Sequence, residues 1–260
     1  MMKPMVWLGG VGIGGVADGV WPFTIPAVAQ MGSLEFDAPV TFLAGENGSG
    51  KSTVLEAIAV ACGCPAAGGP SNRTLTGPRV APRDYNVEWA LGTHVTPRWQ
   101  AKPIGQAFFV RAETFHNLAS DAARGLDPTK PASYEDLQLL SAYGGRSPHS
   151  LSHGEAFLEL FGGRLVAQAL YFMDEPEAPL SFRSCLSLLV TIRELVEVGT
   201  QLIIATHSPV LLAYPNAIIY ELGDWGIERR PWADTNTVAD LRLFLEAPER
   251  HLRHLFATET

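Results

Sequence analysis

The sequence contains no uninterrupted apolar run of about eighteen residues, the length that a membrane-crossing helix needs. It has three cysteines, Cys62, Cys64 and Cys185, which are too few and too unevenly spaced for a disulfide framework or a complete metal site. The N-terminus lacks a basic segment followed by an apolar one and a cleavage site. We therefore expect a soluble, cytoplasmic protein with reduced thiols and no direct membrane insertion.

Basic charge is also scarce. The 19 Lys and Arg residues face 27 Asp and Glu residues, which leaves a formal net charge of -8. Nucleic-acid binding is possible but is not indicated by this charge, because it would need a local basic patch. Five basic residues are spread singly among prolines, at Arg73, Arg79, Arg83, Arg98 and Lys102. They either touch a polyanion or form an ordinary solvated surface.

Length and composition predict a folded domain with a substantial core. Of 260 residues, 47% are hydrophobic and 18% are charged, values typical of one globular domain of mixed α/β class. We expect a flexible Gly-rich leader at 1–20, a central domain at 21–225 and a C-terminal helical extension at 226–260. The leader contains the pattern GxGxxG, but residues 16–22 cannot form the helix that would receive a pyrophosphate.

A phosphate-loop pattern, GENGSGKS, stands at residues 45–52. A β-prone apolar run at 40–44 precedes it, and residues 52–61 have the apolar spacing of a helix. Because a triphosphate is held away from water only by many N–H donors, a cation and a metal, this loop predicts a nucleoside triphosphate site. The alternative is a Gly-rich turn before an ordinary helix.

The prediction gives the loop residues individual roles. Lys51 would reach the β- and γ-phosphates, and the Ser52 hydroxyl would be a ligand of Mg²⁺. The residues expected to surround the phosphates are Gly45, Glu46, Asn47, Gly48, Ser49, Gly50, Lys51, Ser52 and Thr53.

Further apolar runs predict two layers of strands. Uninterrupted runs indicate buried parallel strands at 107–110, 170–173, 202–205 and 217–220. An antiparallel layer beside the nucleotide is expected from strands at 23–28 and 33–36 and a hairpin at 86–90 and 94–96.

Helices are expected to cover these strands. The clearest begins at its cap Ser181, ends at Gly199, and carries the apolar residues Leu186, Leu189, Ile192, Leu195 and Val196. Residues 113–169 have the polar texture of a helical insertion. Residues 238–256 are spaced like a helix interrupted near Pro248, which we expect to pack on the core, with a partner surface as the alternative.

Polar residues follow two of the buried strands. Asp174 and Glu175 come after 170–173, and His207 comes just after 202–205. Asp174 would hold Mg²⁺ through its water shell, and Glu175 would orient or deprotonate the attacking water. His207 would contact the γ-phosphate. The alternatives are solvated surface carboxylates and a structural histidine.

One more segment completes a recognisable order of motifs. Ser152, in Leu151–Glu155, is expected to cap a helix whose N–H groups would face an anion. Phosphate loop, Leu-Ser-x-Gly-Glu, apolar strand with Asp-Glu, and apolar strand with His together resemble the ATP-binding-cassette ATPases over about residues 21–225. The resemblance is closest to small soluble ATPases with the signature Ser-His-Gly-Glu and the sequence Asp-Glu-Pro-Glu, found here at 174–177.

The resemblance implies a fold and a mechanism. The fold would be α/β, a P-loop NTPase of ABC ATPase type, with a mainly parallel sheet, an antiparallel β layer and a helical insertion. The cofactors would be ATP and Mg²⁺. Two chains would form an ATP-dependent, head-to-tail homodimer, in which Ser152 and Gly154 of one subunit contact the γ-phosphate held by Lys51 of the other. Trp21 or Phe23 would stack on adenine, although core packing is equally expected for either.

Three positions depart from the family pattern. Glu113 is the candidate for the glutamine that follows the strand before the insertion, His153 replaces a signature glycine, and the usual aspartate is missing from 178–181. The leading hypothesis is a soluble ATPase that acts on an unidentified macromolecular client. The alternatives are the ATP-binding subunit of a membrane transporter and a nucleotide-triggered interaction module with little turnover.

Overall fold

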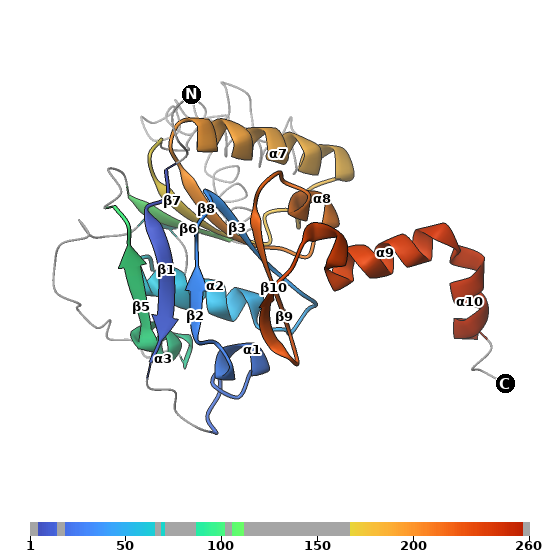
Figure 1. Ribbon diagram of the computed structural model, residues 1–260, viewed down its shortest axis with the longest axis horizontal. Coiled ribbons are helices and arrows are strands. Elements are labelled where there is room, and N and C mark those ends of the chain that lie inside the picture. Colours follow the sequence, from blue (N-terminus) through green and yellow to red (C-terminus); the bar gives the residue numbers. More distant parts are fainter. Residues whose placement is uncertain are drawn as a thin grey trace, which may run out of the picture.

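The computed structural model describes residues 5–14, 19–65, 69–70, 87–101, 106–111 and 167–256 (Figure 1). Several sequence predictions lie outside these residues. They are the helical insertion up to residue 166, the signature residues Ser152, His153 and Gly154, the candidate Glu113, and the basic residues Arg73, Arg79, Arg83 and Lys102.

A seven-stranded sheet forms the centre of the protein, in the order β10-β9-β3-β8-β7-β6-β4. Its five inner strands are parallel: β9 (Ile218–Gly223), β3 (Val40–Ala44), β8 (Gln201–Ala205), β7 (Leu170–Asp174) and β6 (Ala107–Arg111). The edge strands β10 (Gly226–Arg229) and β4 (Gly69–Pro70) are antiparallel to their neighbours. All four predicted parallel strands are confirmed, because strands covered on both faces keep an uninterrupted apolar sequence.

Helices cover both faces of this sheet (Figure 1). On one face, α2 (Lys51–Ala61) packs in a core cluster with Leu43, Leu170 and Ile203. On the other, α7 (Phe182–Glu197) and α8 (Pro209–Leu212) pack against the sheet in a second cluster. All three cysteines are buried and free.

The predicted ends of α7 are confirmed, but one predicted core residue is not. Ser181 Oγ accepts a hydrogen bond from the Ser184 N–H, and Gly199 follows the helix with φ +85°. The buried residues are Cys185, Leu188, Ile192 and Leu195. Leu186 is 45% exposed, because two residues along a helix turn a side chain to the opposite face from Leu188.

The flexible leader predicted for residues 1–20 is wrong for its central part. Leu8–Ile13 forms β1, which pairs antiparallel with β2 (Ser33–Glu35) and β5 (Val95–Trp99) in a separate three-stranded sheet. The Gln201 side chain joins this strand to the large sheet by accepting from the N–H groups of Trp7 and Leu8. A Cβ atom at Gly10 would lie 2.5 Å from the Leu34 carbonyl oxygen, so a glycine there serves close strand packing rather than flexibility.

Two predicted strands are helices. Instead of a strand at 23–28, the chain forms the short helix α1 (Pro26–Ala29), which begins at a proline whose φ favours a first helical turn. Instead of the first hairpin strand, Val87–His94 forms α3, while the second predicted hairpin strand becomes part of β5. A Cβ atom at Gly92 would lie 2.7 Å from Val60 Cγ1, so this glycine allows α3 to approach α2 and does not form a turn.

The C-terminal segment differs from its prediction in two ways. Residues 226–229 belong to the sheet as β10, so the helical part begins later, with a 3-10 turn (Trp232–Asp234), α9 (Asn236–Glu246) and α10 (Pro248–Phe256). The interruption at Pro248 is confirmed. Packing on the core is wrong beyond Val238, because α9 and α10 extend away from the body and expose Leu241, Phe244, Leu245, Leu252 and Leu255 (Figure 1). A partner surface there stays a prediction.

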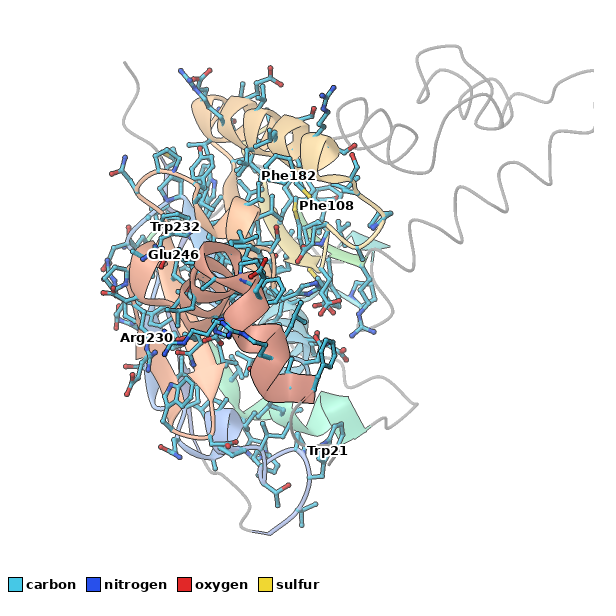
Figure 2. The ribbon with its side chains drawn as sticks, turned by 90° about the vertical axis from the view of Figure 1, so that its right-hand side faces the viewer. Trp21, Phe108, Phe182, Arg230, Trp232 and Glu246 are labelled. Carbon is cyan, nitrogen blue, oxygen red and sulfur yellow. The ribbon has the colours of Figure 1, made fainter. Side chains whose placement is uncertain are left out.

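Polar contacts fix the base of this segment, where Figure 2 labels Arg230 and Trp232. Arg230 Nη1 pairs with the buried Glu221 Oε2 at 2.9 Å, and the Asn236 N–H donates to Glu221 Oε1 at 2.7 Å. Trp232 Nε1 donates to the Pro209 carbonyl oxygen at 2.9 Å.

In the part of the chain that the structure describes, no helix is long and apolar enough to cross a membrane.

Candidate functional site

The loop between β3 and α2 has the backbone that its glycines permit. Gly45, Gly48 and Gly50 have φ values of +139°, +83° and +95°, which L-residues rarely adopt. A Cβ atom at Gly45 would lie 2.4 Å from the Leu222 carbonyl oxygen. No side chain caps α2 at Gly50, so the amide end of the helix is left for an anion.

Lys51 is the first residue of α2 and directly follows this loop. Its Nζ donates to the carbonyl oxygens of Gly45 at 2.8 Å and Glu46 at 2.7 Å, and the residue is 3% exposed. Burial lowers the pKa of Lys51, while the negative charges of Glu175 and Asp174 act in the opposite direction. A phosphate group at the loop would supply the anion that this buried cation lacks at short range among the described residues.

Ser52 and Asp174 form the second part of the site. Ser52 Oγ donates to Asp174 Oδ1 at 2.8 Å. Burial raises the pKa of Asp174, although the Ser52 hydrogen bond and the Arg111 charge oppose the shift. A hydroxyl and a carboxylate this close fit Mg²⁺, a hard cation that takes oxygen ligands and usually keeps waters and substrate phosphates as the remainder. Among the described residues, no group of three His, Cys, Asp or Glu gathers to hold a metal alone.

The ends of β7 and β8 lie side by side, because Asp174 pairs with Ala205 in their parallel ladder. Glu175 then turns sharply, with φ +47°, and its N–H donates to the Ala205 carbonyl oxygen at 2.9 Å. His207 Nδ1 lies 3.7 Å from Glu175 Oε1. The left-handed turn thus directs the Glu175 carboxylate out of the strand and toward the pocket instead of into the sheet.

Glu177 is a site residue to which the sequence pattern gave no role. It is 7% exposed, and its Oε1 accepts hydrogen bonds from the Thr206 hydroxyl and from the His207 N–H at 3.0 Å. His207 Nδ1 lies 3.6 Å from the same oxygen. The third acid of Asp-Glu-Pro-Glu therefore anchors the histidine segment, and its place in that four-residue pattern is the signal that could have identified it.

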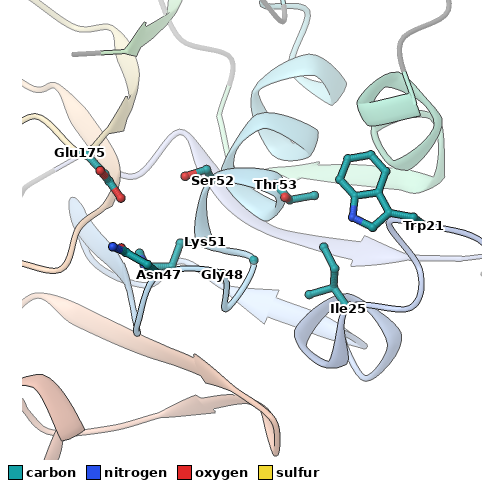
Figure 3. A pocket seen from close by; sticks show the side chains of 9 residues that line it. Trp21, Ile25, Asn47, Gly48, Lys51, Ser52, Thr53 and Glu175 are labelled. Atoms are coloured by element: carbon teal, nitrogen blue, oxygen red, sulfur yellow. The ribbon is translucent and has the colours of Figure 1, made fainter. Parts of the chain in front are cut away.

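A pocket of about 490 Å³ opens over the phosphate loop (Figure 3). Its lining includes Trp21 and Ile25 on one side, Lys51 and Ser52 at the loop, and Glu175 on the opposite side. Trp21 is 46% exposed, whereas Phe23 is 5% exposed and packs edge-on against His94. Of the two aromatic candidates for adenine, only Trp21 therefore lines the pocket that the structure describes.

Comparisons with known proteins agree with the fold. Residues 29–90, which contain β3, the phosphate loop and α2, match the AAA domain family model. No curated protein matches the sequence significantly. The strand, loop and helix at the site agree with this partial match, and the predicted α/β fold with a phosphate loop is confirmed.

Three solved structures resemble the chain at low sequence identity. A metal-chelate type ABC transporter in an inward-facing conformation has a TM-score of 0.48 and 16% identity, covering 91% of this chain and 88% of its own. For cbiO1 of Clostridium perfringens, part of the ABC transporter complex cbiONQ, the TM-score is 0.45, the identity 17% and the coverage 86% and 91%. For the SMC head domain of Thermotoga maritima, these values are 0.48, 13%, 87% and 99%.

The structure brings together most of the predicted site. Lys51, Ser52 and Thr53 come from the start of α2, Asp174 and Glu175 from the end of β7, and His207 from the end of β8. Ser152 and Gly154 lie outside the described residues.

Proposed function

We propose that this chain is a cytoplasmic, Mg²⁺-dependent ATPase that forms a head-to-tail homodimer around ATP and acts on a macromolecular client. The observation that carries the proposal is the Ser52–Asp174 hydrogen bond, with Lys51 and Glu175 in the same pocket. A buried lysine, a hydroxyl, a buried carboxylate and a second carboxylate are the groups that phosphoryl transfer to water requires.

Different side chains of the pocket bind different parts of the nucleotide. Trp21 stacks on the base at one side, and the amide end of α2 receives the phosphates at the centre. Lys51 exchanges its two carbonyl partners for phosphate oxygens, which gives its charge a full counter-ion. Ser52 and Asp174 would hold Mg²⁺, which would supply charge neutralisation when bound.

Glu175 orients the attacking water and takes its proton, a role worth about a hundredfold to ten-thousandfold in rate. Its side chain is 34% exposed, so water reaches it from the pocket. His207, whose backbone N–H is held by the Glu177 carboxylate, donates a hydrogen bond from its side chain to the γ-phosphate. The last two assignments predict that turnover, and not ATP affinity, depends most on Glu175 and His207.

The dimer is proposed because the phosphate loop lies at the carboxyl end of β3, where the described residues of one chain would leave the γ-phosphate open to water. A second chain would cover it with Ser152 and Gly154. ATP would then stabilise the dimer by mass action, and hydrolysis would release it.

ATPase rate per chain, measured across protein concentrations, tests this proposal together with gel filtration. We expect the rate per chain to fall steeply on dilution. Glu175→Gln should lose at least about a hundredfold in turnover yet form dimers that persist with ATP. A flat rate on dilution and no ATP-dependent dimer would contradict the two-chain site, while dimers that form with ATP in an unmodified chain without turnover would favour an interaction module.

A further inference from the structure

Arg111 is a basic residue beside Asp174, one of the two residues proposed to hold Mg²⁺. It is the last residue of β6, and it lies opposite Asp174 in the parallel ladder with β7. Its Nη2 forms an ion pair with Oε2 of Glu56, on the helix that begins at the phosphate loop. Its Nε lies 3.9 Å from Asp174 Oδ2. One cation therefore links the phosphate-loop helix to the strand that carries the metal ligand.

The Arg111 charge lies among side chains that are largely shielded from water. The side chains of Glu56, Asp174 and Arg111 are 2%, 12% and 29% exposed. Glu56 Oε1 and Arg111 Nε are buried without a hydrogen-bond partner in the described structure. Because Coulomb interactions are several times stronger in such surroundings than in water, loss of the cation would leave two poorly screened acids at this edge.

The geometry also leaves Asp174 free to bind a cation. At 3.9 Å, Arg111 Nε is too far from Asp174 Oδ2 for a hydrogen bond, so the interaction between them is electrostatic. The other carboxylate oxygen is held by Ser52. A metal can therefore approach the Ser52–Asp174 pair without breaking a hydrogen bond to Arg111, whose guanidinium stays on Glu56 and over the Phe109 ring, 5.0 Å from its centroid.

We propose that Arg111 is a positioning residue that offsets the charge of Asp174 before Mg²⁺ arrives, and so lets the site accept ATP with or without the metal. The inference rests on the proposed ATP site. Without Mg²⁺, the Asp174 carboxylate repels the incoming triphosphate, and Arg111 reduces this repulsion. With Mg²⁺ held by Ser52 and Asp174, this carboxylate would already have a cation beside it, so Arg111 would contribute little to ATP affinity.

The test measures the dissociation constant of ATP for the full chain, once in excess Mg²⁺ and once in EDTA, by titration calorimetry. In Arg111→Met, the constant in EDTA should rise at least about tenfold and the constant in Mg²⁺ less than about threefold. Arg111→Lys, which keeps the charge, should restore most of the wild-type ratio of the two constants. Arg193→Met is the matched control, since Arg193 pairs with Glu197 on the exposed face of α7.

Arg111→Met leaves the buried Glu56 unpaired and risks unfolding. The double variant Glu56→Gln/Arg111→Met removes that unpaired acid and is compared with Glu56→Gln alone, since the two differ only in the cation beside Asp174; the EDTA-to-Mg²⁺ ratio should again be higher without the arginine. An EDTA-to-Mg²⁺ ratio in the folded double variant within about twofold of that in Glu56→Gln overturns the role of Arg111 alone. If the unmodified chain binds ATP under neither condition, the proposed function itself fails.

Discussion

The Ser52 hydroxyl donates a hydrogen bond to Asp174 Oδ1 over 2.8 Å, although 122 positions separate the two residues. The bond joins the first turn of α2 to the end of β7, and so brings the phosphate loop and the acidic strand end into one site. Two oxygen donors are therefore already in place for a metal.

Ser52→Ala tests this pairing. Loss of the hydroxyl leaves a buried carboxylate with one partner fewer, so the free energy of unfolding should fall by about 1 kcal/mol or more in urea. Addition of Mg²⁺ should no longer tighten ATP binding in a calorimetric titration. Ser187→Ala is the control, because Ser187 Oγ donates to a carbonyl of its own helix on an exposed face. Equal Mg²⁺ effects in both variants would contradict the metal assignment.

In the absence of nucleotide and metal, Asp174→Asn should raise the free energy of unfolding of the protein. Burial raises the pKa of Asp174 above its ordinary 3.8, so the folded protein binds this proton more readily than the unfolded chain does. Between 3.8 and the raised folded pKa, the free energy of unfolding therefore falls as pH rises.

Urea unfolding of both proteins at neutral pH and at about pH 4 measures this effect. The variant should be the more stable protein at neutral pH, and its advantage should shrink at the lower pH, where a larger share of wild-type Asp174 is protonated. An advantage that stays constant or grows as the pH falls would show that the buried charge is not its source.

Glu177→Ala should separate turnover from binding. The carboxylate holds the Thr206 hydroxyl and the His207 N–H, so its removal frees His207 without touching the phosphate loop. We expect ATP turnover to fall at least about tenfold while the ATP dissociation constant changes less than about threefold. Glu177→Gln keeps the acceptor oxygen and should recover part of the rate.

Glu197→Ala is the matched control for that experiment, because this glutamate is 60% exposed and pairs with Arg193 on α7. The anchoring role is wrong if Glu177→Ala and Glu197→Ala turn over ATP equally fast.

Gly45→Ala should damage both the fold and the site. Gly45 has φ +139°, and an added Cβ atom would lie 2.4 Å from the Leu222 carbonyl oxygen, which is backbone and cannot rotate away. We expect a loss of at least about 2 kcal/mol in the free energy of unfolding, with weaker ATP binding. Gly32→Ala has open space around it and should cost far less. Thermal unfolding of the two variants, compared side by side, distinguishes them.

The parts of this fold that the sequence predicted are those decided by local pattern. The phosphate loop, the four buried strands and the cap of α7 each depend on residues close together in the chain. The errors arose where tertiary contacts decide. Glycines at 10 and 92 suggested flexibility and a turn, whereas in the structure they allow a strand and a helix to approach their neighbours.

The site shows the same division. Lys51, Ser52, Asp174, Glu175 and His207 were predicted because each belongs to a short pattern at the end of a strand or the start of a helix. The contacts of Glu177 with Thr206 and of Arg111 with Glu56 link residues 29 and 55 positions apart. No local sequence pattern predicts such pairs, because the two residues of each pair come together only when the sheet has formed.

Calorimetric titration of MgATP into the wild-type chain and into Lys51→Ala tests the central claim most directly. Nζ of Lys51 is the buried cation of the phosphate loop, so we expect saturable binding to the wild type and at least about hundredfold weaker binding to the variant. Circular dichroism should show that both proteins are folded. Equal affinity in the two folded proteins, or no heat of binding from either, would contradict the assignment of this loop to ATP.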